Sequence, residues 1–233
     1  MPQTQFKELP QVQINEVAKD PLNEVIKNAS IQERPCEETM DYYKNWASDY
    51  DKDTSDAQYK GPQITAEALE KLRLPKTARI LDVAAGTGLV GEELRKKGFT
   101  NVDGLDGSQA LLEIAQKKNV YRRYITALIG DDRKAPLDDN EYDAVVLSGA
   151  FSPGHLYTDC LPELIRIVKP GGYICWSMRD FSCYSERFRE DKFNEGVEEL
   201  CRVGLWKKVH EPYTFQNFLV GKEGKVYSML VTK

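Results

Sequence analysis

The sequence predicts an α/β fold in which helices cover both faces of a seven-stranded, mostly parallel sheet with an antiparallel last strand. An apolar segment at 78–83 runs into a glycine turn and then into a helix-compatible segment, as at the start of a β-α-β unit. A second apolar segment ends at Asp106, 24 residues after Asp82, which is the spacing of one β-α-β step. The chain closes with two strand patterns, 206–220 and 225–232, joined by a short loop that reverses the last strand.

Length and composition favour one folded domain. The chain has 233 residues, of which 41% are hydrophobic and 30% charged, enough for one sizeable α/β domain with additions. A net charge of −5 argues against a nucleic-acid-binding groove. No apolar stretch is long enough to span a bilayer, and the first thirty residues lack the apolar core of a signal peptide. The five cysteines are odd in number and lack C-x-x-C spacing, which is typical of reduced thiols. We therefore expect a cytoplasmic protein that binds neither nucleic acid nor membrane and holds no metal.

The amino-terminal part of the chain divides into an arm and a cap. Residues 1–34 have scattered apolar positions without a sustained period, and we expect a flexible or partly helical arm. Residues 35–233 are expected to form a single domain with a helical cap at 37–74. Four residues share one face of a cap helix: Tyr43, Trp46, Ala47 and Tyr50. Two interpretations are open for Tyr43 and Trp46, namely contact with a cofactor and ordinary core packing.

The glycine turn after the first strand is the main candidate binding site. Gly86 and Gly88 suit a tight turn into a helix whose first N–H groups point at a polar or anionic ligand. With Gly91 they fit the dinucleotide pattern G-x-G-x-x-G, but Asp82 would repel a pyrophosphate and instead suits a ligand with a cationic end. S-adenosylmethionine carries an ammonium and a sulfonium group and no phosphate, so we expect this cofactor here; a glycine turn without a ligand is the alternative. The candidate contacts in this segment are Asp82, Ala84, Gly86, Thr87 and Gly88.

Asp106 is placed to bind the sugar of that cofactor. Because the carboxyl ends of parallel strands meet at one edge of a sheet, Asp82 and Asp106 are expected there together, and Asp106 can accept hydrogen bonds from both ribose hydroxyls. Asp106 or Ser108 can also cap the helix expected at 109–118. Further candidate cofactor contacts follow Asp106 along the chain: Gly107, Ser108 and Leu111.

The most apolar strand is expected at 141–150, and its pattern is typical of a strand buried on both faces. Its exit lies at the edge where substrates meet cofactors in open α/β sheets. Ser148, near its end, is a candidate cofactor contact. His155, one of only two histidines, lies in the loop that follows and is the candidate general base, with a structural or surface role as the alternative. Further strands are expected at 124–129 and 173–178.

Three segments resemble the class I (Rossmann-like) S-adenosylmethionine-dependent methyltransferases, in particular the methyltransferase-like proteins of the Williams–Beuren syndrome chromosome region. They are 81–90 (LDVAAGTGLV), 104–108 (GLDGS) and 168–172 (VKPGG). Ala85 stands where many members carry a cysteine. The resemblance implies S-adenosylmethionine as cofactor and S-adenosylhomocysteine as product. It also implies that Asp131, or alternatively Asp132, accepts a hydrogen bond from the adenine amino group; a solvated acidic turn is the other interpretation.

We expect transfer of a methyl group from this cofactor to a small-molecule acceptor by in-line displacement. The segment that begins at Tyr43 resembles the one that caps the cofactor cleft in many small-molecule methyltransferases. No motif identifies the acceptor, the atom that is methylated or the oligomeric state. The residues expected to line the acceptor pocket are Phe151, Arg179, Phe181 and Tyr184. A catalytically silent binding or scaffold protein with the same fold is the alternative, and a NAD-dependent oxidoreductase is less favoured.

Overall fold

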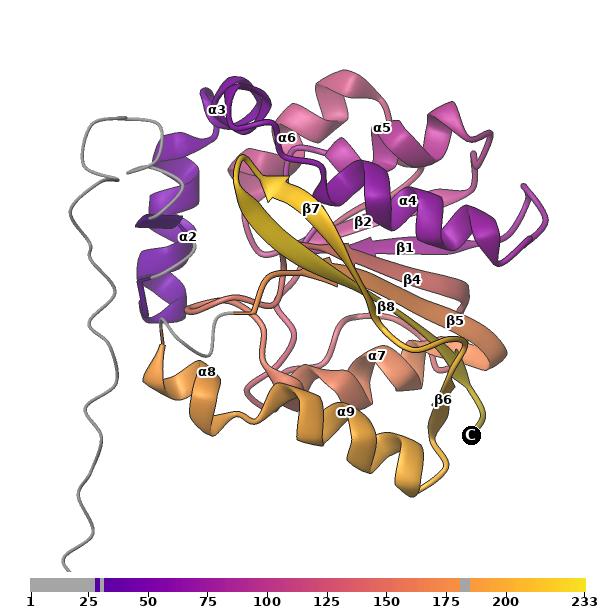
Figure 1. The fold of residues 1–233 in the computed structure, drawn as a ribbon. Coiled ribbons are helices and arrows are strands. Elements are labelled where there is room, and N and C mark those ends of the chain that lie inside the picture. Colours follow the sequence, from indigo (N-terminus) through magenta and orange to yellow (C-terminus); the bar gives the residue numbers. More distant parts are fainter. Residues whose placement is uncertain (1–27, 30–31, 181–184) are drawn as a thin grey trace, which may run out of the picture.

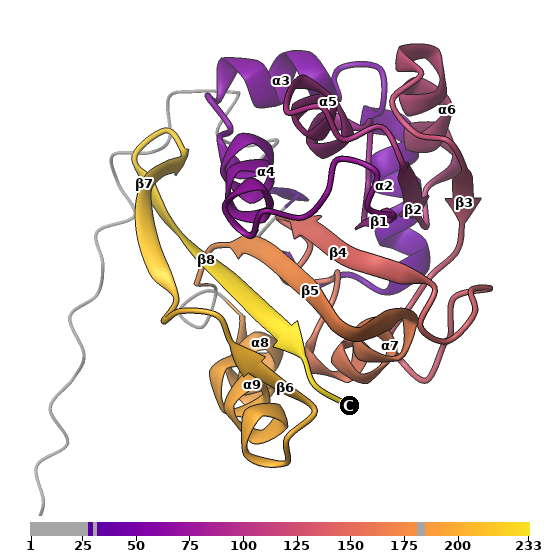
Figure 2. The ribbon, with the colours of Figure 1, turned by 90° about the vertical axis from the view of Figure 1, so that its right-hand side faces the viewer.

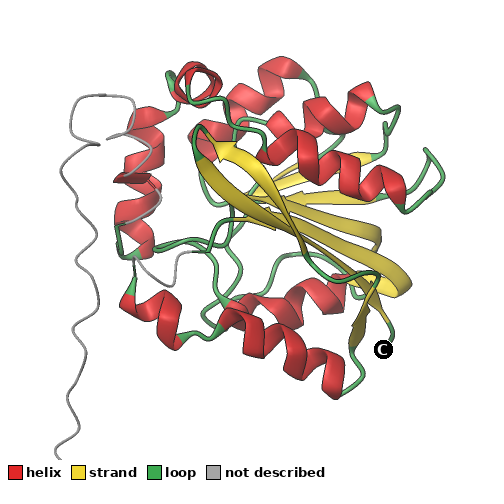
Figure 3. Ribbon diagram, in the orientation of Figure 1, coloured by secondary structure: helices red, strands yellow, loops and turns green. Residues whose placement is uncertain are grey.

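A central sheet of eight strands organises the molecule (Figures 1 and 3). The computed structural model describes residues 28–29, 32–180 and 185–233. The strands lie in the order β3-β2-β1-β4-β5-β8-β6, and β7 also pairs with β8. Their bounds are β1 (Ile80–Val83), β2 (Val102–Asp106), β3 (Tyr124–Thr126), β4 (Tyr142–Ser148), β5 (Val168–Met178), β6 (Trp206–Lys208), β7 (Tyr213–Leu219) and β8 (Lys222–Val231). The first five strands are parallel, and β8 runs antiparallel to β5, β6 and β7.

The sheet has one strand more than the seven expected, because the segment predicted as one strand at 206–220 is divided. Strand β6 pairs with Met229–Val231 of β8, and β7 pairs with residues nearer the start of β8. Pro212 lies between them and has no backbone N–H to give to a β-ladder. The mostly parallel sheet with a reversed end is as expected.

Helices cover both faces of the sheet (Figure 2). Helices α4 and α5 pack against each other over one face, with α6 beside β2 and β3, while α7 and α9 cover the other face. The bounds are α2 (Cys36–Trp46), α3 (Tyr50–Asp56), α4 (Gly61–Lys71), α5 (Leu89–Lys96), α6 (Gln109–Lys118), α7 (Leu161–Ile167), α8 (Glu186–Glu190) and α9 (Phe193–Arg202). A short 3-10 helix, Thr158–Cys160, precedes α7. This is the predicted α/β arrangement.

Alternate residues of the central strands feed two separate cores. In β1, Leu81 and Val83 join the core beneath α7 and α9, whereas Ile80 joins the core beneath α4 and α5. Successive side chains of a strand point to opposite faces, so a strand covered on both sides is apolar throughout. The exception in β1 is Asp82, which shares the face of Ile80 and is wholly buried.

Helices α2 and α3 form a cap, whereas α4, which the cap expected at 37–74 included, packs over the sheet. Figure 1 shows α2 standing across one edge of the sheet, beside α6 and near α8. The contacts of α2 with the loops after β2 and β4 identify this as the edge where the parallel strands end. Residues 32–34, assigned above to the arm, also contact the body of the domain; Glu33 accepts a hydrogen bond from the Tyr157 hydroxyl at 2.7 Å. The cap therefore closes over the carboxyl ends of the strands.

Candidate functional site

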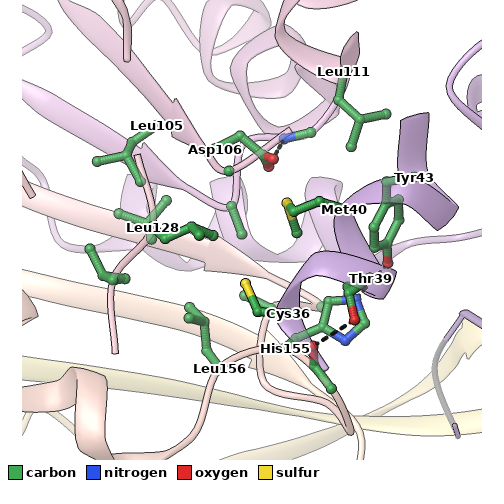
Figure 4. A pocket seen from close by; sticks show the side chains of 18 of the residues that line it. Cys36, Thr39, Met40, Tyr43, Leu105, Asp106, Leu111, Leu128, His155 and Leu156 are labelled. Atoms are coloured by element: carbon green, nitrogen blue, oxygen red, sulfur yellow. Dashed lines mark hydrogen bonds between the residues drawn. The ribbon is translucent and has the colours of Figure 1, made fainter. Parts of the chain in front are cut away.

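A cleft lies beneath the cap at the carboxyl ends of β1, β2 and β4 (Figure 4). It holds about 960 Å³ of space, part of which is open to solvent. The floor comes from the loops that follow the strands, and the roof comes from Cys36, Thr39, Met40 and Tyr43 of α2. The topological switch point of the sheet, between β1 and β4, lies in this floor.

The glycine turn after β1 leaves space in the cleft. Gly86 has φ +55°, and a Cβ built on it meets no atom within 4 Å, although the residue lines the cleft. A side chain here would therefore project into space that a ligand can use. Gly88 has φ +91° at the start of α5, and its Cβ would lie 2.8 Å from a methyl group of Val120. Gly86 thus leaves space in the cleft, and Gly88 allows close packing against Val120.

Asp106 joins the turns after β1 and β2 at the floor of the cleft. Its Oδ2 accepts a hydrogen bond from the backbone N–H of Gly86 at 2.8 Å, and its Oδ1 accepts one from Ser108 N–H at 2.7 Å. Burial raises the pKa of Asp106, and these two N–H groups oppose that rise. Each carboxylate oxygen still has a lone pair for a further donor. Asp106 can therefore accept hydrogen bonds from a ligand without losing its own bonds.

Asp82 does not line this cleft. The strand alternation turns its side chain towards the face under α4 and α5, where its Oδ2 accepts a hydrogen bond from the Tyr121 hydroxyl at 2.5 Å. The other oxygen is buried without a hydrogen-bond partner among the described residues. Burial raises the pKa of Asp82 to about 8. The expected juxtaposition with the cationic end of a cofactor is therefore not seen, and Asp82 lies below the glycine turn.

Tyr43 and His155 face each other where the cap meets the loop after β4 (Figure 4). Nδ1 of His155 lies 2.8 Å from the carbonyl oxygen of Pro153, which only accepts, so Nδ1 carries the proton. Nε2 then accepts a hydrogen bond from the Tyr43 hydroxyl at 2.7 Å. Burial lowers the pKa of His155. The histidine is therefore neutral, and its free nitrogen is covered by a tyrosine of the cap.

Asp51 of the cap is bound to the opposite side of the cleft. Its Oδ1 accepts a hydrogen bond from the Thr87 hydroxyl at 2.5 Å, and its Oδ2 forms an ion pair with Lys118 of α6 at 2.5 Å. Thr87 is almost fully buried and does not line the cleft. This residue, expected to contact the cofactor, instead connects the glycine turn to the cap.

The predicted cofactor residues fall into two groups. Those that line the cleft are Tyr43, Ala84, Gly86, Asp106, Gly107, Leu111, Asp131 and Ser148, together with the candidate base His155. Those outside the lining are Trp46, Asp82, Thr87, Gly88, Ser108 and Asp132. Ser108 caps α6 instead, because its hydroxyl accepts a hydrogen bond from the Leu111 N–H at 3.4 Å. The carboxyl group of Asp131 pairs with Arg133 at 2.7 Å at the rim of the cleft.

The residues expected in an acceptor pocket are separated by the structure. Phe151 is fully buried in the core, where its ring packs against Phe193 and Trp176. Arg179 lines a second cavity beside the cleft. Phe181 and Tyr184 lie outside the described residues. An apolar residue just after β4 can line a pocket or join the core. Phe151 joins the core through contacts with segments distant in the chain, which the local sequence pattern does not show.

Some cleft residues were not predicted. Met40 and Leu128 line the cleft on either side of Gly107, whose Cβ would lie 2.4 Å from Leu128 and 2.9 Å from the sulfur of Met40. Met40 precedes Tyr43 by three residues, so helical periodicity places the two side chains on the same face of α2 and could have indicated that Met40 lines the cleft. Arg34 and Arg187 also line the cleft, and no pattern around them marks this role.

Comparison with known proteins identifies the family. A family model described as "Methyltransferase domain" matches residues 80–172. "Methyltransferase-like protein 27" of Homo sapiens is 35% identical over 170 residues, which are 72% of this chain and 68% of that protein. A "Demethylmenaquinone methyltransferase" of Staphylococcus epidermidis is 27% identical over 143 residues, 59% of this chain and 58% of that protein.

Solved structures share the fold at lower identity. A SAM-dependent methyltransferase of Leishmania major has a TM-score of 0.60 and 17% identity, over 88% of this chain and 89% of that one. The structure named as the [4+2]-cyclase SpnF has a TM-score of 0.55 and 14% identity, over 73% of this chain and 80% of that one. These two similarities concern the fold alone.

No helix among residues 28–29, 32–180 and 185–233 is both long enough and apolar enough to cross a membrane. In the same ranges, no three His, Cys, Asp or Glu side chains are grouped so that they would hold a metal ion.

The identity and coverage of the human relative establish the family of this chain and confirm the resemblance seen in the sequence. The chain belongs to the class I S-adenosylmethionine-dependent methyltransferases.

Proposed function

We propose that this chain transfers a methyl group from S-adenosylmethionine to a small-molecule acceptor, with the cofactor in the cleft beneath the cap. The observation that carries this proposal is the convergence of Asp106, Gly86 and Gly107 on one open space. The acid keeps lone pairs for ribose hydroxyls, and Gly86 leaves room for a ligand beside it. The residues present therefore fit the cofactor that the family uses.

Several side chains have separate roles in holding the cofactor under this proposal. Asp106 binds the sugar, and Met40 and Leu128, which line the cleft beside Gly107, offer apolar surface to the base. Asp131 at the rim provides an acceptor for the amino group of adenine. The carboxyl group of Asp82 acts from below, by fixing Tyr121 and the end of β1 rather than by touching the cofactor.

The reaction is an in-line displacement under this proposal, in which the bound cofactor supplies a methyl group made electrophilic by its sulfonium. The protein positions the acceptor and takes up its proton where it has one. His155 is the final proton acceptor, but its Nε2 is covered by the Tyr43 hydroxyl. A proton therefore reaches His155 through Tyr43: the tyrosine oxygen takes the proton of the acceptor while its own proton passes to Nε2.

A small acceptor is supported by the architecture of the site and by a relative. A second cavity of about 510 Å³, part of it open to solvent, adjoins the cleft and offers space beside the proposed cofactor. The name of the Staphylococcus epidermidis relative describes methylation of demethylmenaquinone, which is a small molecule. The net charge of −5 supports a protein without nucleic-acid partners. The free thiols at Cys36, Cys160, Cys175 and Cys201 support a location in the reducing cytoplasm.

Calorimetric titration tests the cofactor assignment. We expect S-adenosylhomocysteine and S-adenosylmethionine to bind with micromolar or lower Kd, on the order of −8 kcal/mol, and NADH not to bind. Asp106→Asn removes the charge that holds the ribose, and we expect about tenfold weaker binding. Asp143→Asn, a strand carboxyl remote from the cleft lining, is the matched control and is expected to bind as the wild type does. Binding of NADH in place of S-adenosylhomocysteine would contradict the assignment.

A second candidate is a protein of this fold that binds the cofactor without transferring its methyl group. The likeness to a structure named as a cyclase shows that this fold also occurs in a protein named for another reaction. A broad acceptor screen with labelled S-adenosylmethionine separates the two candidates. Methyl transfer to any acceptor excludes the silent protein, whereas tight cofactor binding with no transfer to any acceptor favours it.

A further inference from the structure

Four hydroxyl groups form a hydrogen-bonded network behind the cleft. Tyr59, between α3 and α4, bonds Ser148 at the end of β4 at 2.7 Å. Ser148 bonds Ser177, its pairing partner on β5, at 3.2 Å. Thr65 of α4 bonds Ser177 at 2.7 Å, and Ser177 bonds the carbonyl oxygen of Gly61 at 3.2 Å. Of these four hydroxyl residues, Ser148 is the one that lines the cleft.

The carbonyl group at one end fixes the direction of the protons in this network. The Gly61 carbonyl only accepts, so the Ser177 hydroxyl donates its single proton there. Ser177 therefore accepts from Thr65 and from Ser148. Because Ser148 gives its proton to Ser177, Tyr59 is the donor in the bond to Ser148. This arrangement places one proton in each of the four contacts.

The Tyr59 hydroxyl is suited to this donor role. Burial raises its pKa, so the hydroxyl keeps its proton at neutral pH. The Tyr59 ring packs against Phe218 of β7 with 5.1 Å between centroids, and the backbone N–H of Lys60 bonds the Phe218 carbonyl at 3.0 Å. The segment between α3 and α4 is thus fixed to β7, and this holds the tyrosine hydroxyl against Ser148.

Two glycines leave the space that the bond between Tyr59 and Ser148 needs. A Cβ on Gly61 would lie 2.5 Å from a ring carbon of Tyr59 and 2.6 Å from the Ser148 oxygen. Gly149 has φ +66°, and its Cβ would lie 2.6 Å from the Tyr59 oxygen. These distances are too short for a carbon atom, so a side chain at either glycine would displace the pair. The local packing is therefore built around this bond.

The direction of the protons decides which ligand group Ser148 can bind. A serine hydroxyl has one proton and two lone pairs. The proton goes to Ser177, one lone pair takes the proton of Tyr59, and no other group among the described residues bonds the Ser148 hydroxyl. In the cleft this hydroxyl therefore offers a lone pair and no proton. It favours a ligand group that donates hydrogen bonds and disfavours a carboxylate, which only accepts.

We propose that Tyr59 is a positioning residue for the cofactor: by donating its proton to Ser148, it makes Ser148 an acceptor for the ammonium group of the methionyl moiety. This inference rests on the proposed function. Of the donors on the cofactor, the ribose hydroxyls are assigned to Asp106 and the adenine amino group to Asp131, so the ammonium group remains for Ser148. Without the Tyr59 hydroxyl, Ser148 can rotate and turn its proton towards the carboxylate of the cofactor instead.

Calorimetric titration of the full chain with three ligands tests the inference. S-adenosylhomocysteine carries an ammonium group and a carboxylate, its desamino analogue lacks the ammonium group, and its decarboxylated analogue lacks the carboxylate. In the wild type we expect the desamino analogue to bind about tenfold or more weakly than S-adenosylhomocysteine. Equal affinities for these two ligands would overturn the inference, while the proposed function would stand. Absence of S-adenosylhomocysteine binding would overturn the proposed function, and the inference with it.

Two variants assign the ammonium preference to the hydroxyl pair. Ser148→Ala removes the acceptor, so we expect about tenfold weaker binding of the two ligands that carry the ammonium group and unchanged binding of the desamino analogue. Tyr59→Phe should weaken the two ammonium ligands about threefold or more and leave the desamino analogue as tight or tighter. An equal loss for all three ligands would indicate a merely structural role and would overturn the inference, as would unchanged affinities in Tyr59→Phe.

Tyr227→Phe and Ser228→Ala are the matched controls, because each removes one buried hydroxyl group away from the cleft lining. The Tyr227 hydroxyl bonds Asn194 at 2.9 Å, and the Ser228 oxygen accepts a hydrogen bond from the Cys175 thiol at 3.6 Å. We expect both variants to bind all three ligands as the wild type does. A loss of ammonium preference in either control as large as that in Tyr59→Phe would overturn the role given to Tyr59.

Discussion

Asp82, one residue before the end of β1, and Asp106, the last residue of β2, are both buried, yet their surroundings give them different roles. Asp106 accepts two backbone hydrogen bonds and faces the cleft. Asp82 accepts one hydrogen bond, from Tyr121, and its second oxygen has none from the described residues. A buried carboxyl group with so few donors favours its protonated form. Asp82 is thus a structural acid, and its charge state links stability to pH.

Replacement of Asp82 by asparagine is expected to stabilise the protein at neutral pH. With a pKa of about 8 in the folded state and 3.8 as the reference, the native protein keeps a proton that the unfolded chain has lost. Between these values the free energy of unfolding therefore falls as pH rises, by up to about 1.4 kcal/mol per pH unit. We expect urea unfolding at pH 5 and pH 7 to show this fall in the wild type and a smaller one in Asp82→Asn.

The control for this prediction has the opposite sign. Against the effect of burial, Lys169 and the backbone N–H of Arg79 lower the pKa of Asp143. Asp143→Asn should therefore lose stability at pH 7, and this loss should diminish as pH falls through the folded pKa of Asp143. The free energy of unfolding should fall more between pH 5 and pH 7 in the wild type than in Asp82→Asn. An equal or smaller fall in the wild type would contradict the role given to Asp82.

The two glycines of the turn after β1 are expected to respond differently to alanine. At Gly86 the positive φ costs about 1–2 kcal/mol, but the new methyl group enters the cleft. Gly86→Ala should therefore weaken S-adenosylhomocysteine about tenfold or more in calorimetry. At Gly88 the Cβ meets Val120 at 2.8 Å, so Gly88→Ala should mainly lower the urea midpoint. Unchanged cofactor affinity in Gly86→Ala would place the cofactor away from this turn.

His155 is expected to titrate below its ordinary pKa of 6.5. Burial disfavours the imidazolium, and the proton on Nδ1 is held by Pro153. Nitrogen-15 NMR of the imidazoles should show the Nδ1–H form at pH 7, with His210→Gln used to assign the two histidines. Below pH 6.5 His155 is protonated in the unfolded chain but stays neutral in the native protein. The free energy of unfolding therefore decreases as pH falls. A midpoint above 6.5 would contradict this environment.

At the scale of elements, the cap is held over the cleft by a few polar contacts on two sides. Thr39 donates a hydrogen bond to the Gly154 carbonyl at 3.1 Å and Tyr43 bonds His155, while Asp51 bonds Thr87 on the other side. Opening of the cap would widen the entrance to the cleft. Because these bonds are few and partly exposed, opening requires much less than global unfolding.

Asp51→Asn is expected to loosen α3 without unfolding the protein. The change removes the ion pair between Asp51 and Lys118. Because both side chains are partly exposed, the loss of stability should stay within about 1 kcal/mol. Amide hydrogen exchange in α3 should nevertheless become faster, since Asp51 connects the cap to α6 and the glycine turn. Asp56→Asn, which breaks an exposed pair with Lys52 on the same helix, is the control and should leave exchange unchanged. Equal exchange in both variants would show that Asp51 does not hold the cap.

Elements defined by local pattern were predictable, and contacts between distant segments were not. The spacing of Asp106 from the first strand requires only one β-α-β step, and β2 ends at that residue. The division of 206–220 into β6 and β7 depends on pairing with two parts of β8, which no local pattern encodes. The alternation of side chains along a strand puts Asp82 on the opposite face from Leu81 and Val83, but which face the cleft uses depends on tertiary packing.

At the scale of the whole molecule, the cleft is assembled from segments far apart in the chain. Residues 32–34 pack beside Gly154, whose Cβ would lie 3.1 Å from the backbone nitrogen of Arg34. Glu33 accepts hydrogen bonds from Tyr157 and from Ser185, and Arg34 lines the cleft. These contacts connect the start of the cap to the loop after β4 and to the segment that begins α8. The amino-terminal edge of the cleft is therefore built by residues that precede α2.

Two deletions test whether that edge contributes to cofactor binding. Removal of residues 1–27 leaves every described contact in place, and we expect the affinity for S-adenosylhomocysteine to stay within about twofold of the full chain. Removal of residues 1–35 also deletes Glu33 and Arg34, so the loop around Gly154 and His155 loses its partners. We expect about tenfold weaker binding, with thermal unfolding still cooperative because both cores lie beyond residue 60. Equal affinity in the two deletions would show that the cleft is complete without residues 28–35, and equal loss in both would place the contribution within residues 1–27.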